Sequence, residues 1–420
     1  RPLALRNAAP RGYHGRCAVP GKPLESGVGG DRERSHEYES GRAIARAGWM
    51  GGEAMGSPEV IIIGAGLAGA ATARALVAAG VSRVLLIDRE PVPGAHSSGR
   101  NAGMVRRAVE DPEIAPLAAA GAAEIDSLDV PFRQSGSFLI ATAERLRRAA
   151  RRSSGHRIIP RREAAARVPL LEGAELDAIL ETPADGGVEV HARRERYLEE
   201  VRAGGGEVRF GLGARAPRIE GGRVRGIDSD EGMIRCRHLV IAAGAWAGEW
   251  GEMAGIPVAL EPCRRHLIST RGFGGAPSRD WPWVWDLEHG FYFRPESAGF
   301  LWSPCDEIPD APGDAVADAA APRWLAEKVA PLLPRAGSLE PLSTWAGHRT
   351  FTPDRRFLLG PDPRLQGWHW AAGLGGHGVT VSAAIGARVA RALLRGEASG
   401  IVETAHLPRE AAFQERIETG

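Results

Sequence analysis

The residues with the clearest chemical meaning are three glycines spaced for phosphate binding, Gly64, Gly66 and Gly69. Gly64 permits a tight turn, Gly66 lets the backbone approach a pyrophosphate, and Gly69 lets the following helix pack closely on a sheet. The start of that helix, at Leu67, offers free N–H groups and a positive dipole end to the phosphates. Asp88 follows about 20 residues later, where a carboxylate can accept hydrogen bonds from a ribose. This pattern predicts a dinucleotide site and does not distinguish FAD from NAD.

The elements around this motif must position it, and the sequence supplies them in the required order. Aliphatic, β-branched runs predict buried strands over 60–63 and 84–87. The alanine-rich stretch between them predicts a helix that Gly80 stops. The alternative interpretation is a structural βαβ unit that binds no ligand.

The rest of the chain predicts a second architecture beside this one. Aromatic residues alternate along the chain from 262 to about 304, which favours antiparallel strands. In chain order we expect a mainly helical section over 111–167, a helix over 188–203, a strand over 207–210, a hairpin over 218–227, strands over 239–242 and 368–372, and a helix over 379–394.

Three further segments of small residues could let a flat ring or a phosphate approach the backbone. They are 93–103, 241–246 and 373–378, and the last one again opens a helix. With the first motif, they give the residues that we predict to contact a cofactor: Gly64, Gly66, Leu67, Gly69, Asp88, Arg89, Ser97, Ser98, Asn101, Ala102, Gly103, Ala243, Gly244, Gly375, Gly376, Gly378, Val379 and Thr380.

Together these segments resemble the FAD-dependent D-amino-acid oxidase superfamily, in the branch with monomeric sarcosine oxidase, glycine oxidase and D-arginine dehydrogenase. The resemblance covers 60 to about 394 and includes the run Trp345-Ala346-Gly347-His348-Arg349 and the nearby Thr352-Pro353-Asp354. It implies noncovalent FAD, with the helix at 379 aimed at the flavin pyrimidine, where its dipole would stabilise the negative charge of the reduced ring.

The resemblance also implies an α/β fold, in which a Rossmann-type FAD-binding domain is interleaved with an antiparallel α+β substrate domain. The FAD-binding domain would comprise residues 58–134, 184–260 and 343–400, and the substrate domain residues 135–183 and 261–342. Residues 1–57 are rich in Arg, Gly and Glu, lack an apolar period, and are predicted to be a disordered extension. Residues 401–420 would form a tail.

Four residues are candidates for the substrate site. Arg349 offers a guanidinium fork that can grip a carboxylate bidentately, as the matching arginine does in D-arginine dehydrogenase. Tyr292 and Arg264 match substrate-contacting residues of the same relative, the arginine with less certain register, and His377 matches an active-site histidine of monomeric sarcosine oxidase. The alternatives are a surface ion pair for Arg349, a core position for Tyr292 and a structural loop histidine for His377.

Departures from the relatives are also informative. Met104 and Val109 stand where D-arginine dehydrogenase has polar residues, which favours a smaller or more apolar substrate side chain. Gly347 stands where monomeric sarcosine oxidase has its flavin-linking cysteine, and Thr380 where it has a carboxylate-binding lysine. Of the two lysines in the chain, Lys328 is predicted to lie on a solvated helix surface and Lys22 in the extension, so neither is expected above the ring.

Composition excludes several other classes of protein. A net charge of +1 with dispersed basic residues argues against a nucleic-acid partner. No apolar run is long enough to span a membrane. Cys17, Cys236, Cys263 and Cys305 form no metal-binding or disulfide pattern, so we predict no metal site and a reducing, cytoplasmic location, with peripheral attachment to a membrane left open.

The sequence therefore predicts an FAD-dependent enzyme that oxidises the C–N bond of a small amino acid or N-methyl amino acid by hydride transfer to flavin N5. A dehydrogenase using a quinone or a protein as electron acceptor is slightly favoured over an oxidase, because no lysine is placed to assist oxygen. The alternatives are a 2-hydroxy-acid dehydrogenase of the same fold and a non-catalytic flavin-bearing assembly protein.

Overall fold

The computed structural model describes residues 56–151, 155–176, 178–272, 277–297, 299–336 and 339–396. The predictions for residues 1–55, including Cys17 and Lys22, and for the tail at 401–420 lie outside the described residues.

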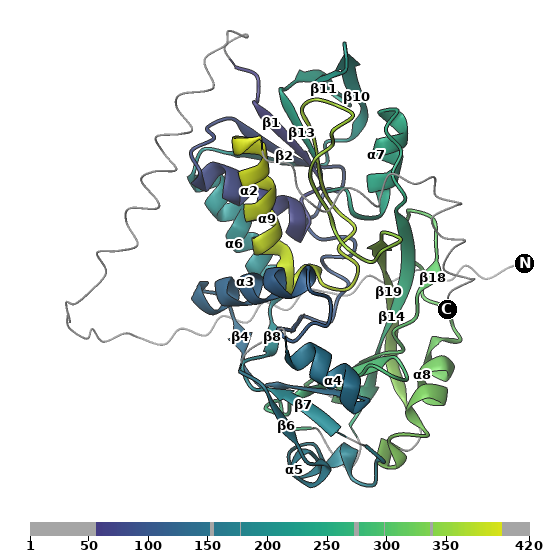
Figure 1. The fold of residues 1–420 in the computed structure, drawn as a ribbon. Coiled ribbons are helices and arrows are strands. Elements are labelled where there is room, and N and C mark those ends of the chain that lie inside the picture. The colour runs from purple at the N-terminus through teal and green to yellow at the C-terminus, as the bar shows by residue number, and fades with distance from the viewer. Residues whose placement is uncertain are drawn as a thin grey trace, which may run out of the picture.

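A six-stranded sheet forms the core of one half of the molecule, in the order β20-β21-β13-β1-β2-β9 (Figure 1). All neighbours in it are parallel except β20, which runs antiparallel to β21. Strand β1 is aliphatic throughout and β2 is aliphatic up to Asp88, as is typical of strands that are covered on both faces. The bounds are β1 (Val60–Ile63), β2 (Val84–Asp88), β9 (Glu207–Phe210), β13 (His238–Ile241), β20 (Leu358–Pro361) and β21 (Trp368–Ala372).

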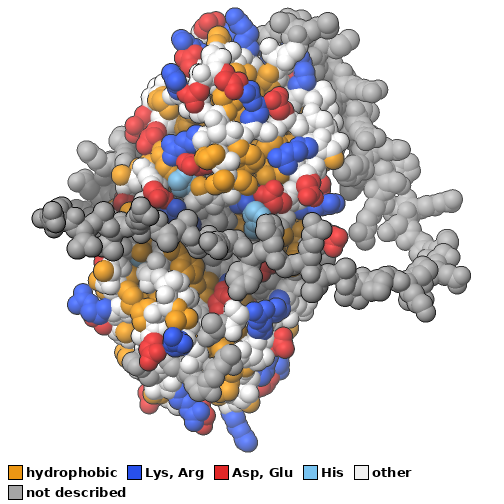
Figure 2. Space-filling view, turned by 180° about the vertical axis from the view of Figure 1, so that it is seen from behind, with side chains coloured by type: hydrophobic (Ala, Val, Ile, Leu, Met, Phe, Trp, Pro, Cys, Tyr) orange, Lys and Arg blue, Asp and Glu red, His pale blue; other side chains and the backbone are white. Residues whose placement is uncertain are grey.

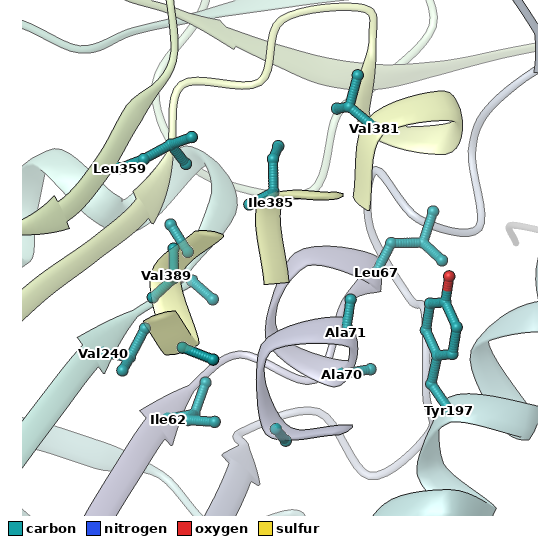
Figure 3. Close-up of a cluster of buried hydrophobic side chains, with 14 of the residues drawn as sticks. Ile62, Leu67, Ala70, Ala71, Tyr197, Val240, Leu359, Val381, Ile385 and Val389 are labelled. Atoms are coloured by element: carbon teal, nitrogen blue, oxygen red, sulfur yellow. The ribbon is translucent and has the colours of Figure 1, made fainter. Parts of the chain in front are cut away.

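Helices α2 and α9 pack against each other over this sheet (Figure 3). Ile385 and Val389 of α9 lie in one buried cluster with Ala71 of α2 and Val240 of β13. Gly386 makes the close approach possible, because a Cβ atom there would lie 2.4 Å from the carbonyl oxygen of Ala71. The helices in this half are α2 (Leu67–Ala78), α3 (Ile114–Ser127), α6 (Val190–Ala203) and α9 (Gly378–Arg395).

A larger, mostly antiparallel sheet forms the other half, in the order β18-β14-β17-β16-β15-β5-β7-β6, with β19 paired to β14. Its strands are β5 (Ser137–Ala141), β6 (Arg157–Ile159), β7 (Ala178–Thr182), β14 (Glu261–Arg271), β15 (Trp283–Asp286), β16 (Phe291–Pro295), β17 (Gly299–Ser303), β18 (Ile308–Pro309) and β19 (Pro341–Phe351). The helices beside it are α4 (Ala143–Ala150), α5 (Arg161–Arg167) and α8 (Ala321–Val329). A second core of aromatic and aliphatic side chains lies on this sheet.

Two small sheets and one short helix complete the described part. One sheet is β10-β11-β12 and the other is β3-β8-β4. The bounds are β10 (Ala214–Glu220), β11 (Arg223–Ser229), β12 (Gly232–Arg235), β3 (Met104–Val105), β8 (Gly186–Val188), β4 (Phe132–Arg133) and α7 (Ala247–Met253), with 3-10 turns at Pro169–Leu171, Gly244–Trp246 and Pro334–Ala336.

The α/β fold class and the predicted strands at 60–63, 207–210 and 368–372 are confirmed. The mainly helical section expected over 111–167 is wrong, because β4, β5 and β6 separate its three helices. The sequence did not predict these strands because each is short and pairs with strands that are distant in the chain, as β5 does with β15.

Strands β14 and β19, which are far apart in the sequence, run side by side in the larger sheet (Figure 1). Residues 343–400 are predicted to belong to the FAD-binding domain, and this assignment stays a prediction. In the structure, β19 pairs with β14 along nearly all of its length, so Arg349 reaches the site from the larger sheet.

Candidate active site

A cavity of about 400 Å³ lies between the carboxyl ends of the parallel strands and the larger sheet. This is the place where open α/β sheets bind ligands, because the loops after the strands diverge there. The predicted cofactor-contacting residues that line the cavity are Gly64, Gly66, Leu67, Asp88, Arg89, Ser97, Ser98, Asn101, Ala102, Gly103, Ala243, Gly244, Gly375, Gly376, Gly378 and Val379.

The first glycine turn is built for a close approach of backbone and ligand. Gly64 has φ +100°, and a Cβ atom there would lie 2.5 Å from the carbonyl oxygen of Ala242. A Cβ atom at Gly66 would lie 2.9 Å from Oγ of Ser98. No side chain of α2's N-cap closes the helix end, and the N–H of Leu67 donates to Ser98 Oγ at 2.9 Å. Ser98 occupies the N–H of Leu67, and a phosphate can approach the other N–H groups at the positive end of α2.

Asp88 and Trp246 shape one end of the cavity. Asp88 accepts backbone N–H bonds from Ala65 at 2.8 Å and from Glu90 at 2.9 Å, which fixes its carboxylate at the end of β2. The guanidinium of Arg89 lies 4.0 Å from the centre of a Trp246 ring. Both side chains line the cavity, so this end combines a ribose-type hydrogen-bond acceptor with a flat aromatic wall.

The loop before α9 lines the opposite part of the cavity through Gly375 and Gly376. His377 caps α9 with its backbone only and does not line the cavity. Burial lowers the pKa of His377 to about 4, and the positive charge of Arg106 adds to this shift. The imidazole is therefore neutral at pH 7, and its ring centre lies 5.9 Å from that of Phe357.

Arg349 is buried in the cavity wall with 7% of its surface exposed. Its Nη1 donates to the carbonyl oxygen of His348 and its Nη2 to that of Arg100, both at 3.0 Å. Burial lowers its pKa, with Arg265 adding to the effect. Among the described residues, no ion pair neutralises Arg349, and a buried guanidinium without an acid is suited to bind an anionic ligand.

Arg265 lines the cavity, and the predicted Arg264 next to it does not. Arg264 points away from the cavity and donates to the carbonyl oxygen of Val316 at 3.1 Å. Arg265 lines the cavity and is 6% exposed, because successive side chains of β14 point to opposite faces. In the β14–β19 register Arg265 lies opposite Gly347, two residues before Arg349, so the two guanidinium-bearing side chains are diagonal neighbours on one face.

Arg265 is held by hydrogen bonds that leave part of its fork free. Its Nε donates to the carbonyl oxygen of Asp306 at 3.2 Å, and its Nη2 pairs with Glu307 at 2.6 Å. Burial opposes its charge, but Cys305 and Glu307 nearby raise its pKa above the ordinary value. Its Nη1 lies 3.4 Å from where a Cβ atom of Gly376 would be, which places this nitrogen beside the loop before α9.

Tyr292 and Trp285 stand beside these arginines. Tyr292, on β16, lines the cavity, and burial raises the pKa of its phenol, so it stays protonated and can donate a hydrogen bond. Its ring meets that of Trp285 edge-on, with the ring centres 5.4 Å apart. Met104 also lines the cavity. Val109, expected beside it, lies instead in the hydrophobic core under α9.

Three other predicted residues lie away from the cavity lining. Gly69 packs against the first turn, where a Cβ atom would lie 1.9 Å from the carbonyl oxygen of Gly64. Thr380 Oγ1 accepts a hydrogen bond from the N–H of Arg106 at 3.1 Å. The solvated position predicted for Lys328 is wrong: its Nζ donates to the carbonyl oxygens of Gly290 at 3.0 Å and Pro304 at 2.5 Å, which hold it off the cavity.

Sequence reasoning missed Arg265, Trp246 and Trp285 as lining residues. For Arg265, the available signal was the adjacency of Arg264 and Arg265 in a predicted strand, since neighbouring side chains of a strand point to opposite faces. For the tryptophans the sequence held no signal beyond their aromatic character.

Comparison with known proteins decides the family. A family model described as FAD dependent oxidoreductase (DAO) matches residues 59–392. The chain belongs to the DAO family of FAD-dependent oxidoreductases. It is 26% identical over 367 residues to 4-methylaminobutanoate oxidase (formaldehyde-forming) of Paenarthrobacter nicotinovorans, covering 80% of this chain and 43% of that protein. It is 22% identical to human mitochondrial dimethylglycine dehydrogenase over 374 residues, covering 81% and 43%. The chain thus spans less than half the length of these relatives.

Solved structures share the DAO fold. The structure is similar to that of L-proline dehydrogenase from P. horikoshii, with a TM-score of 0.74 and 23% identity over 87% of this chain and 98% of that one. It is also similar to glycine oxidase from Geobacillus kaustophilus, with a TM-score of 0.69 and 22% identity over 83% and 98%. At this identity the likeness shows the fold.

The cavity fits the FAD of this family. The glycine turns leave room for backbone contact, α2 presents an open helix end, and Asp88 is fixed at the end of β2. At Gly347 a Cβ atom would lie 2.9 Å from Cβ of Arg100, so a longer side chain there has no space. None of the three cysteines in the described ranges lines the cavity.

Proposed function

We propose that this DAO-family protein oxidises the C–N bond of a small amino acid or N-methyl amino acid, whose carboxylate is held by Arg349, Arg265 and Tyr292. The observation that carries the proposal is the charge of this end of the cavity. Two buried guanidinium groups line it beside a neutral phenol, and the acidic lining residues of the cavity are Asp88, Glu90 and Glu249, away from these strands. Such a set of donors is complementary to a carboxylate.

The roles of the residues follow from their geometry. FAD, when bound, accepts the hydride from the carbon next to the substrate nitrogen. Arg349 and Arg265 fix the carboxylate from two neighbouring strands, and a carboxylate fixed at two points orients the carbon beside it. Tyr292 donates its phenolic hydrogen. The amine must be neutral for its lone pair to assist, and the two nearby cations disfavour an ammonium group there. Water then hydrolyses the imine product.

The printed names of the relatives support this substrate class, since they act on amines or amino acids that bear a carboxylate. We further propose that the protein is a dehydrogenase that passes electrons to a quinone or a protein. Lys328 is tied to two backbone carbonyls outside the cavity lining. The charge of the lining arginines is spread over a plane, and it stabilises a nascent superoxide less well than a compact ammonium group.

The test is anaerobic mixing of the FAD-loaded protein with D- and L-amino acids, N-methylglycines and 2-hydroxy acids. Bleaching of the flavin by an amino acid, with ammonia or methylamine released in equal amount, is the expected result. Bleaching by hydroxy acids alone would favour the 2-hydroxy-acid dehydrogenase. No bleaching by any of them would favour the non-catalytic flavoprotein.

A further inference from the structure

An aromatic side chain, Trp285, lines the cavity near the two arginines, and its ring contacts the buried guanidinium of Arg106. Trp285 of β15 lines the cavity together with Met104, and it contacts Tyr292 edge-on. The guanidinium carbon of Arg106 lies 4.8 Å from the centre of the Trp285 ring. The indole lines the cavity and Arg106 does not.

Arg106 is held firmly in this position. Its Nε donates to the carbonyl oxygen of Ala108 at 2.8 Å, and its Nη2 pairs with Glu110 at 2.7 Å. Burial opposes ionisation of Glu110, but the charge of Arg106 holds the pKa of this carboxyl below its ordinary value. The side chain of Arg106 is only 8% exposed, which places its charge in a medium of low dielectric constant.

A cation on one face of an indole changes what the other face can bind. The negative face of an aromatic ring attracts a cation, and a second cation brought to the same ring is repelled by the first. Glu110 offsets part of the field of Arg106, but it does not line the cavity. The lining near Trp285 adds the charges of Arg265, which is paired with Glu307 at 2.6 Å, and of Arg349, for which the described residues supply no ion pair; no acidic side chain lines this part of the cavity. A positively charged substrate side chain therefore finds no partner here.

We propose that Trp285, backed by Arg106, is the specificity-determining wall of this site. It selects amino acids whose side chain or N-substituent is neutral and apolar, and it excludes those that carry a second positive charge. Arg106 acts through the indole and is a positioning and electrostatic residue that does not touch the substrate. The proposal rests on the proposed function for the placement of the carboxylate at Arg349 and Arg265.

The selectivity proposed for Trp285 and Arg106 can be tested without turnover, by comparing the binding of two carboxylates of equal chain length. Hexanoate and 6-aminohexanoate differ in a terminal ammonium group, and their binding to the FAD-loaded protein can be followed by the perturbation of the flavin spectrum. We expect hexanoate to bind at least about tenfold more tightly, as expected for repulsion between like charges at this range. In Arg106→Gln the ratio of the two Kd values should fall to about threefold or less, and in Arg106→Lys it should stay near the wild-type ratio.

The controls separate a charge effect from a loss of structure. Arg264→Gln removes an arginine that faces away from the cavity, and it should leave the ratio unchanged. If Arg106→Gln does not retain FAD, Trp285→Leu removes the ring instead and should weaken hexanoate binding with FAD retained. Equal Kd values for the two carboxylates in the wild type, no binding of either, or an unchanged ratio in Arg106→Gln would overturn the proposal.

The same proteins distinguish this inference from the proposed function. Norleucine and lysine of one configuration repeat the comparison with the amino group present. If neither amino acid bleaches the flavin while hexanoate still binds more tightly than 6-aminohexanoate, the proposed oxidation is wrong and the proposed role of Trp285 and Arg106 is supported. If both bleach it at equal kcat/KM, the oxidation stands and the wall is wrong.

Discussion

The two adjacent arginines of β14 show that a shift of one position along a strand decides whether a side chain faces the cavity. Arg264 and Arg265 have the same chemistry, yet only Arg265 faces the cavity. The pleat turns one of them to Val316 and the other to Gly376. This pair supplies a matched comparison for the carboxylate site.

Replacing the cavity arginines should reduce catalysis while FAD content stays normal. Arg349→Lys should lower kcat/KM at least about 100-fold, because lysine cannot reproduce the bidentate fork. Arg265→Gln should also lower it, mainly through KM, whereas the control Arg264→Gln should stay within about twofold of wild type. Steady-state kinetics on the best substrate of the panel provides the measurement. Equal losses at 264 and 265 would contradict the assignment.

A second expectation at this scale concerns the link between protein and flavin. Because Gly347 leaves no space for a linking side chain, denaturation in acid should release all of the FAD into solution. The measurement is the absorbance of the supernatant after the polypeptide is precipitated. Flavin that stays with the precipitated chain would refute noncovalent binding.

At the scale of the elements, α2 must lie very close to the first strand for its N-terminus to reach a phosphate. Gly69 is the contact point, since an added Cβ atom would meet the carbonyl oxygen of Gly64. Gly69→Ala should therefore push α2 away, lower stability by about 1–3 kcal/mol and weaken FAD binding. Gly248→Ala is the control. Gly248 also lies in a helix, α7, and a Cβ atom there would meet only Leu260, at an ordinary contact distance of 3.8 Å. Flavin fluorescence titration and thermal unfolding measure both effects, and an unaltered FAD affinity in Gly69→Ala would argue against this role.

A pair of histidines joins β13 to β21 and should make the sheet sensitive to acid. Nδ1 of His238 lies 3.0 Å from Nε2 of His369. Burial lowers the pKa of His238 to about 4 and that of His369 to about 3. Between pH 6.5 and about 4 the unfolded chain therefore binds more protons than the folded one, so stability falls as the pH decreases, by up to about 1.4 kcal/mol per pH unit for each histidine.

The measurement is the free energy of unfolding in urea from pH 7 to 4.5. His369→Gln should give a shallower decline than wild type over this range. The exposed His191 of α6 provides the control, and His191→Gln should preserve the wild-type slope, because a glutamine can still accept the hydrogen bond from Arg194. The same slope in wild type and His369→Gln would show that this pair does not govern the acid response.

At the scale of the whole molecule, charge is abundant but compact cations are scarce. Lysines occur only at 22 and 328, and Lys328 is bound to backbone carbonyls of the larger sheet. Positive and negative side chains are interspersed on the face shown in Figure 2, with no continuous basic stripe there. In the described part of the chain, no helix has the length and apolarity needed to cross a membrane.

The scarcity of lysine leads to the prediction about the electron acceptor. The substrate-reduced protein should react slowly with oxygen and be reoxidised much faster by a soluble quinone analogue. Stopped-flow mixing with air-saturated buffer and with the quinone measures the two rates side by side. Rapid reoxidation by oxygen, with one hydrogen peroxide formed per flavin, would make the protein an oxidase.

The amino-acid sequence by itself determined the parts of this protein that depend on local spacing. We could predict the glycine turn at 64–69, the flanking strands and the position of Asp88, because neighbouring residues alone define these features. Arg349 could be proposed because it belongs to a short run that resembles the family. The expectation for Lys328 failed because the partners of its ammonium group come from other segments.

Only the tertiary structure decided which side chains meet across the two halves. The pairing of β14 with β19 brought Arg265 next to Arg349, although these residues lie far apart along the chain. The tertiary structure also brought Arg106 into contact with the indole of Trp285, which comes from β15. Pairing between distant strands is fixed by the packing of the whole molecule, so no local pattern in the sequence could reveal these contacts.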